Sequence, residues 1–306
     1  MSGPVGADEA GRSEPAPKRS KAASIWRRTR TGAALVGVLA LSFWATAAIG
    51  SSWPVFAIGG LLAAATLFEV GRMGRLRGRG WTAPLAVGLV AAAAVWIVRD
   101  SLLGAERVQD SVLSVAAAVY VAAGLAAFAV GLATRAERPH LAAALALWIV
   151  PPLPLLAEVY GSFERAGHPA LAGLGALILL SKIGDIAGYY AGNALGRHHP
   201  FKKLSPGKTT EGCLASFLVG AAAGPACTAL GLFPPGLDTL SAILIGATVN
   251  LAAQSGDLLE SWVKRRVQVK DSSTWLGASG GMLDVCDSLL VTVPVALVTW
   301  PLLIPA

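Results

Sequence analysis

Long apolar stretches recur along the whole chain, and they constrain its fold more than any other feature. A stretch of about 18 or more apolar residues is long enough to cross roughly 30 Å of hydrocarbon as a helix. Of the 306 residues, 54% are hydrophobic and only 14% are charged, which leaves little polar sequence between the stretches. The sequence therefore predicts an all-α, polytopic membrane protein.

About nine spans are predicted, and the apolar stretches lie at residues 32–50, 52–70, 81–98, 112–133, 141–157, 169–193, 212–232, 239–256 and 282–304. Residues 1–24 have no apolar periodicity and are rich in Gly, Pro, Ser and Ala, so we expect a disordered tail. Residues 25–168 are predicted to form an N-terminal scaffold, and residues 169–306 a C-terminal domain that carries the main polar segments.

The first apolar stretch has two interpretations. It follows Arg27, Arg28 and Arg30 and ends in Ala-Thr-Ala-Ala, a pattern that also occurs in cleaved signal peptides. Its near-spanning length and the spans that follow at once favour a retained first span. In the fifth stretch, Pro151, Pro152 and Pro154 predict a break in the helix.

Basic residues alternate between loops in a way that predicts orientation. The loops on the side of the N-terminal tail carry most of the lysines and arginines, whereas the opposite loops carry only Arg99, Arg107 and Arg165. The positive-inside rule then puts the N-terminus in the cytoplasm and the C-terminus outside. The net charge of +7 is explained by these loops and by anionic lipid headgroups as partners, and we expect no nucleic-acid binding.

The first polar segment runs from Ser181 to Glu211. Lys182 and Asp185 share one face of the sixth predicted span, where they either line a polar cavity or form an ion pair that joins helices. Lys208 and Thr209 follow a turn and suit phosphate oxygens. They do not form a P-loop, because that motif requires glycine at position 202, which is a lysine.

The second polar segment runs from Gly256 to Ser288 and concentrates acids and bases between two apolar stretches. On a helix, four of its polar residues lie on a single face: Asp257, Glu260, Ser261 and Lys264. Asp284 and Asp287 are likewise three residues apart at the start of the last span.

Oxygen ligands from two helices that enter from a common surface suit Mg²⁺, with substrate phosphates completing its shell. The alternative is a solvated loop with helix-terminal carboxylates. That alternative is disfavoured for Asp257, because an acid at the C-terminal end of an apolar stretch opposes the helix dipole. Gly280 and Gly281 permit a close backbone approach. Cys286, between the two aspartates, is expected to be a small buried residue and not a ligand.

The second segment resembles the signature of the CDP-diacylglycerol synthase (phosphatidate cytidylyltransferase) family. The matching residues are Ser261, Lys264, Arg265, Lys270, Asp271, Gly280, Gly281, Asp284 and Asp287. The segment around Lys208-Thr209 is also similar. Two positions depart from the family pattern: Ser279 replaces a histidine and Val285 replaces an arginine, which puts full activity in doubt.

The resemblance implies a nucleotidyltransferase that makes CDP-diacylglycerol and pyrophosphate from CTP and phosphatidate at the cytoplasmic face of the cell membrane. It implies Mg²⁺ as the cofactor and leaves open K⁺ as a second ion. Residues 169–306 would then be the catalytic domain. Homodimerisation stays open, because nothing in the sequence identifies an interface.

Site roles follow from the resemblance. Asp257, Asp284 and Asp287 are expected to hold metal, with Ser261 as a further ligand, and Lys264 joins the three aspartates as a catalytic residue. The expected substrate-binding residues are Lys182, Asp185, Lys208, Thr209, Ser261, Arg265 and Lys270.

Three other functions remain open. One is a CTP-dependent kinase or cytidylyltransferase that acts on another lipid, such as a polyprenyl acceptor. Another is a catalytically inactive homologue, suggested by Ser279 and Val285. A transporter is disfavoured, because the charges gather at one membrane face and no inverted repeat is evident.

Overall fold

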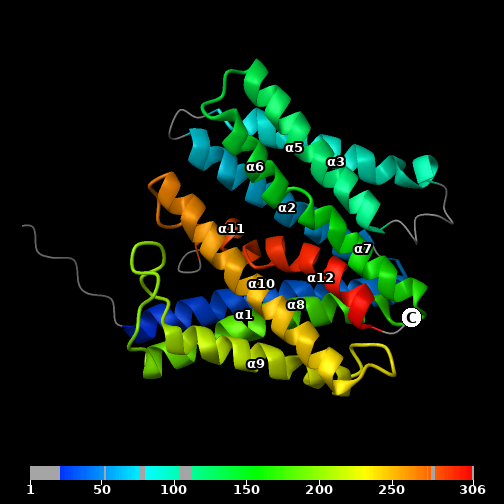
Figure 1. Ribbon diagram of the computed structural model, residues 1–306, viewed down its shortest axis with the longest axis vertical. Coiled ribbons are helices and arrows are strands. Elements are labelled where there is room, and N and C mark those ends of the chain that lie inside the picture. The colour runs from blue at the N-terminus through cyan, green and yellow to red at the C-terminus, as the bar shows by residue number, and fades with distance from the viewer. Residues whose placement is uncertain are drawn as a thin grey trace, which may run out of the picture.

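The computed structural model describes residues 21–51, 53–75, 80–103, 112–273, 275–276 and 280–304. Within these ranges every regular element is a helix (Figure 1), which confirms the all-α prediction. The helices are α1 (Lys21–Ile49), α2 (Trp53–Arg75), α3 (Thr82–Leu103), α5 (Val112–Ala133), α6 (Pro139–Ile149), α7 (Pro152–Arg165), α8 (Ala170–Leu195), α9 (Thr210–Ala229), α10 (Thr239–Arg266), α11 (Met282–Cys286) and α12 (Leu289–Leu303). Because α1 begins at Lys21, the last four residues of the predicted tail are helical.

Among the described residues, five helical segments are long and apolar enough to cross a membrane. They are Gly32–Ile49, Ala170–Leu195, Thr210–Ala229, Thr239–Arg266 and Met282–Leu303. Helices α3, α5 and α6 contribute shorter apolar segments. These helices indicate a membrane protein, as the sequence predicted.

The predicted proline break lies between α6 and α7. Helix α6 ends at Ile149, and α7 begins at Pro152, so the predicted span 141–157 is two helices. Proline has no backbone N–H, which makes it well suited to the first turn of a helix and unfavourable in a helix interior.

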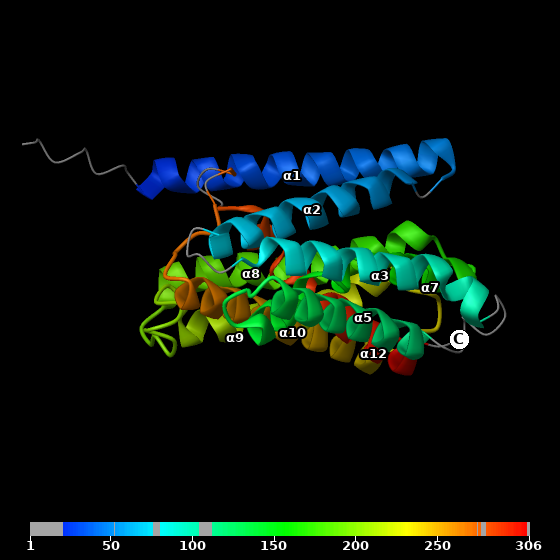
Figure 2. The same cartoon turned by 90° about the horizontal axis from the view of Figure 1, so that it is seen from above.

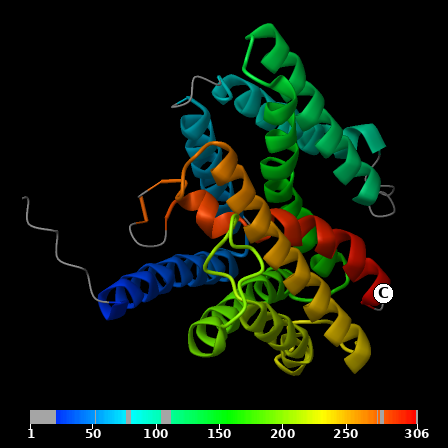
Figure 3. The ribbon, with the colours of Figure 1, turned by 60° about the vertical axis from the view of Figure 1, so that its left-hand side comes forward.

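Two hydrophobic cores organise the bundle. One is formed mainly by α2, α3, α5 and α6, and it also takes in Val263 of α10, Leu283 of α11 and Leu290 of α12. The other is formed mainly by α7, α8, α10 and α12. Figures 1 and 3 show α10, α11 and α12 between α3, α5 and α6 on one side and α8 and α9 on the other, and Figure 2 shows α1 along the outer edge beside α2. The C-terminal segment thus lies where the two cores meet.

Helices α8, α9 and α10 approach closely through glycines. A Cβ atom added at Gly188 would lie 3.0 Å from the Gly212 carbonyl oxygen, and one added at Gly184 would overlap the Asn250 side chain. Asn250 itself is fully buried and hydrogen-bonds Ser216 of α9. Small residues at such contacts allow the close van der Waals packing on which helix association in lipid depends.

Candidate active site

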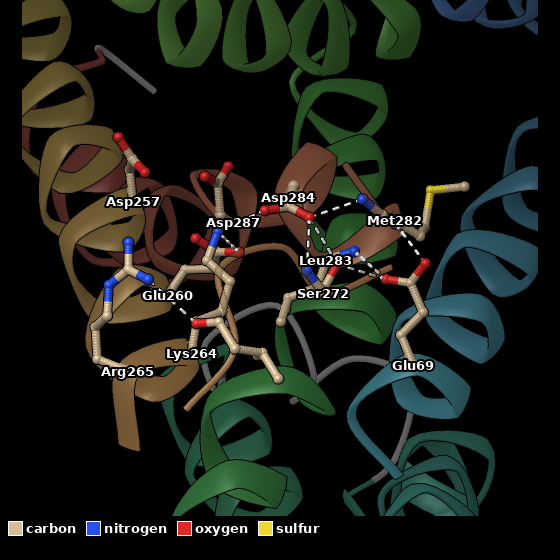
Figure 4. A network of polar contacts seen from close by, with 12 residues as sticks. Glu69, Asp257, Glu260, Lys264, Arg265, Ser272, Met282, Leu283, Asp284 and Asp287 are labelled. Carbon is tan, nitrogen blue, oxygen red and sulfur yellow. Dashed lines mark hydrogen bonds and ion pairs between the residues drawn. The ribbon is translucent and has the colours of Figure 1, made fainter. Parts of the chain in front are cut away.

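Helix α10 continues past the predicted span end at residue 256 to Arg266, so the polar residues after Gly256 are helical, as predicted. A Cβ atom added at Gly256 would lie 2.5 Å from the carbonyl oxygen of Asp287. The backbones of α10 and of the α11–α12 junction therefore touch at this level. This contact brings the carboxylates of the two segments together (Figure 4).

Three of these carboxylates form a group that we call the acid cluster: Asp257, Glu260 and Asp287. Their carboxylate oxygens lie within 4.8 Å of one another. Glu260 and Asp287 are only 1% and 7% exposed, whereas Asp257 is half-buried. Buried carboxylates gathered this closely repel one another unless cations neutralise them. Hard oxygen ligands at this spacing are what a divalent cation such as Mg²⁺ requires.

Lysines from two other segments reach the acid cluster. Lys208, in the loop before α9, places its Nζ 2.7 Å from Asp257 Oδ2. Lys182 of α8 places its Nζ 3.5 Å from Asp287 Oδ1 and donates a 2.8 Å hydrogen bond to the Val285 carbonyl. Lys182 therefore joins two helices, and Asp185, one turn further along α8, interacts electrostatically with Lys182, Asp257 and Lys208.

Asp284 has a different environment from the acid cluster, although it belongs to the same sequence motif. Its Oδ2 accepts hydrogen bonds from the Gly281 amide (2.7 Å), from the Ser272 hydroxyl (2.7 Å) and from the Ser272 amide (3.2 Å). Its Oδ1 lies 2.5 Å from Lys264 Nζ, which is also 2.7 Å from Glu260 Oε1. Lys264 thus connects Asp284 to the acid cluster, and its ammonium group is held between two carboxylates.

The metal set expected from sequence differs from the group that the structure brings together. Asp257 and Asp287 belong to both. Glu260 lies on the helical face that the sequence predicts, although it was not among the expected metal ligands. Asp284 was among them, and the structure surrounds it with hydrogen-bond donors. Ser261 is buried on α10 directly after Glu260.

Gly280 and Gly281 make the close approach that the sequence predicted. Gly280 has a φ of 84°, in the left-handed region that favours glycine. A Cβ atom added at Gly281 would overlap the Ser272 hydroxyl and the Glu69 carboxylate. Only glycine therefore fits at this point of the loop.

Glu69 of α2 was assigned no role from sequence, yet it is 1% exposed and lies against the same loop. It accepts hydrogen bonds from two serines and two backbone amides of residues 272–283. The only sequence signal was a carboxylate at the end of an apolar stretch. Glu158 and Glu164 share that signal, so it did not single out Glu69.

Of the remaining predicted substrate-binding residues, Thr209 and Arg265 have structural contacts, and Lys270 is exposed. The Thr209 hydroxyl caps α9 by accepting a 3.1 Å hydrogen bond from the Gly212 amide. Arg265 is exposed and donates to the carbonyl oxygens of Leu204 and Val269, both at 3.3 Å, so it ties together the loops before α9 and after α10. Lys270 is exposed on the loop after α10.

The two departures from the family pattern fall in different places. Ser279 lies outside the described residues. Val285 lies in α11, where its backbone carbonyl accepts the hydrogen bond from Lys182. Cys286 is fully buried, as predicted, and the three cysteines are free.

Comparisons with known proteins indicate the family to which the chain belongs. The model of the cytidylyltransferase family matches residues 26–303. A phosphatidate cytidylyltransferase of Helicobacter pylori (strain J99) is 32% identical over 154 residues, 50% of this chain and 55% of that protein. One of Aquifex aeolicus is 39% identical over 113 residues, 37% of this chain and 41% of that protein.

An Escherichia coli protein, Uncharacterized protein YnbB, is 38% identical over 127 residues, 39% of each chain. The matches thus span about half the length of these relatives or less. The family model, in contrast, covers nearly the whole of this sequence. The chain therefore belongs to the cytidylyltransferase family.

Proposed function

We propose that this protein transfers the cytidylyl group of CTP to phosphatidate, giving CDP-diacylglycerol and pyrophosphate. The observation that carries the proposal is the acid cluster at the contact between α10 and the α11–α12 junction, with lysines from two other segments beside it. Membership of the cytidylyltransferase family supports the nucleotide, and the names of the Helicobacter pylori and Aquifex aeolicus relatives support the lipid acceptor.

Asp257, Glu260 and Asp287 are the residues that would hold Mg²⁺. The spacing of their oxygens fits one divalent cation, and each of the three is already paired with a lysine ammonium group, which supports a preference for positive charge at this position. Bound there, the ion would supply charge neutralisation for the phosphates of CTP and for the leaving pyrophosphate. In this proposal Glu260 replaces Asp284 in the metal set, because the Asp284 oxygens already receive four donors.

The chain's own cations then have two different tasks. Lys208 and Lys182, which now neutralise Asp257 and Asp287, are the cations placed to bind triphosphate oxygens. Lys264 stays between Glu260 and Asp284 and fixes their positions. Preorganised cations of this kind stabilise the charge that develops during transfer without reorganising at that moment.

The reaction itself needs no strong base. An oxygen of the phosphatidate phosphate, ionised at neutral pH, attacks the α-phosphorus of CTP and forms a new P–O bond. The bond from the α-phosphorus to the bridging oxygen breaks, and pyrophosphate leaves with that electron pair. Positioning and charge stabilisation are the main contributions that a protein makes to such a transfer.

We further propose nine spans with a cytoplasmic N-terminus, so that the site faces the cytoplasm. In support, the hydrogen bond from Arg265 to Leu204 and the ion pair from Lys208 to Asp257 show that both polar loops lie at one end of the bundle. These loops carry the basic residues that the positive-inside rule assigns to the cytoplasm. The diacyl tails would remain in the bilayer.

The test is the fate of label from CTP in purified protein in detergent, with phosphatidate and Mg²⁺. Label at the α-phosphate enters the lipid in cytidylyl transfer, whereas label at the γ-phosphate enters it in a kinase reaction. An Asp257→Asn variant should lose the activity. Asp238→Asn is a matched control, because Asp238 caps the far end of the same helix by accepting from the Ser241 amide, and asparagine caps equally well. Absence of α-label in the lipid, in folded protein, would overturn the proposal.

A further inference from the structure

The buried carboxylate of Glu69 joins the N-terminal half of the chain to the loop between α10 and α11. Its Oε1 accepts from the Ser273 hydroxyl (2.6 Å) and the Met282 amide (2.8 Å). Its Oε2 accepts from the Ser272 hydroxyl (2.9 Å) and the Leu283 amide (3.0 Å). Two serines of the loop and the first turn of α11 are therefore fastened to a single side chain of α2.

A neighbouring contact fastens the middle of the same loop. Phe68, adjacent to Glu69 in α2, stacks on Trp275 with ring centroids 5.5 Å apart and an interplanar angle of 20°. The two contacts come from consecutive residues of α2. Helix α2 thus contacts the loop between Ser272 and Trp275 and holds the first turn of α11, which follows the loop.

The Ser272 hydroxyl links this fastening to the candidate active site. Its single proton is shared between two carboxylate oxygens, Glu69 Oε2 at 2.9 Å and Asp284 Oδ2 at 2.7 Å. From Asp284 the chain of contacts continues through Lys264 to Glu260 of the acid cluster. Figure 4 shows this sequence of side chains, from α2 across the loop to α10. A displacement of Glu69 would therefore affect Lys264 through Ser272 and Asp284.

We propose that Glu69 is a positioning residue for the nucleotide site: it fixes Ser272, Ser273 and the first turn of α11 in place and thereby orients Asp284 and Lys264. This inference rests on the proposed function for its link to CTP. A carboxylate whose donors come from this loop and from the first turn of α11 can remain buried only while both are in place, because an unsatisfied buried charge is strongly unfavourable. The N-terminal half of the chain then contributes to the site as well as supporting it.

The experiment compares Glu69→Gln with Glu158→Gln. Glutamine has the same shape, but its NH₂ group cannot accept the donors that one Glu69 oxygen receives. Glu158 is the matched control, because it is also a buried carboxylate (3% exposed), and it pairs with Arg165 inside α7, away from the loop. Each variant is measured for KM of CTP, KM of phosphatidate, kcat, unfolding temperature and hydrogen exchange of the peptide that contains the Met282 and Leu283 amides.

We expect Glu69→Gln to lower kcat/KM for CTP by about 10- to 100-fold, as is typical when a residue behind the substrate-contacting groups is changed. KM for phosphatidate should change little, and exchange at Met282 and Leu283 should accelerate. Glu158→Gln should leave kcat/KM for CTP, KM for phosphatidate and the exchange rates of Met282 and Leu283 close to those of the original protein. This should hold even if its unfolding temperature falls by as much as that of Glu69→Gln.

Two results would overturn the inference. One is unchanged exchange at Met282 and Leu283 in Glu69→Gln, which would show that the loop does not depend on Glu69. The other is accelerated exchange with unchanged kcat/KM for CTP, which would show a structural role alone. If the original protein transfers no cytidylyl group, the proposed function fails. The inference is then decided by the exchange measurement and by binding of CTP itself, which should weaken in Glu69→Gln only.

Discussion

Asp257 and Asp284 belong to one sequence motif, but the structure surrounds their carboxylates differently. Asp257 lies in the acid cluster, where its side chain is 33% exposed and meets the Lys208 ammonium at 2.7 Å. Asp284 accepts from two backbone amides, a hydroxyl and Lys264. The difference teaches that two acids of one polar segment can have separate roles: Asp257 belongs to the acid cluster, whereas Asp284 binds the backbone amides and the hydroxyl of the loop.

The largest expected effect comes from Asp287→Asn, which removes a carboxylate of the acid cluster. Loss of a metal ligand should lower activity by about 10³-fold, because a bound metal supplies several kcal/mol of transition-state stabilisation. Mn²⁺, used as a spectroscopic probe in place of Mg²⁺, should bind much more weakly, as measured by electron paramagnetic resonance. Unchanged Mn²⁺ affinity would remove Asp287 from the metal set.

A smaller effect is expected for Asp284→Asn. The amide cannot accept from all four donors, so the loop shifts and activity should fall by about 10- to 100-fold. Mn²⁺ affinity should stay close to that of the original protein, because the acid cluster is intact. If Asp284→Asn instead weakens Mn²⁺ binding as much as Asp287→Asn does, Asp284 is a ligand, and the contrast between the two environments disappears.

The smallest effect is expected for Lys208→Met, which removes the cation now paired with Asp257. Mn²⁺ affinity should rise by about two- to fivefold, because a partly exposed ion pair of this kind contributes about 1 kcal/mol or less. KM for CTP should rise at the same time, because a phosphate-binding cation is lost. Weaker Mn²⁺ binding in this variant would mean that Lys208 organises the acid cluster and does not compete with metal.

The helical part of the site was predictable from sequence. Asp257, Glu260 and Lys264 follow the i, i+3, i+7 spacing of one helical face, and local periodicity alone determines that arrangement. The predicted close approach at Gly280 and Gly281 was also confirmed. It was predictable because glycine alone combines a positive φ with room for a close neighbour.

The partners of Asp284 were not predictable in the same way. They come from a loop whose path depends on α2, and Glu69 is separated from Met282 by 213 residues. No local pattern encodes a contact over that distance. For the same reason the sequence could not tell which of Glu260 and Asp284 faces Asp287, since both lie on suitable helical faces.

Gly256 illustrates how a site can depend on atoms that are absent. It contributes no charge and no donor side chain, yet a methyl group there would meet the Asp287 carbonyl oxygen at 2.5 Å. A relative of this chain could retain every carboxylate and every lysine described above and still hold α10 and the last span too far apart for them to meet. When members of this family are sorted into active and inactive proteins, the residue at this position therefore carries as much information as the acids themselves.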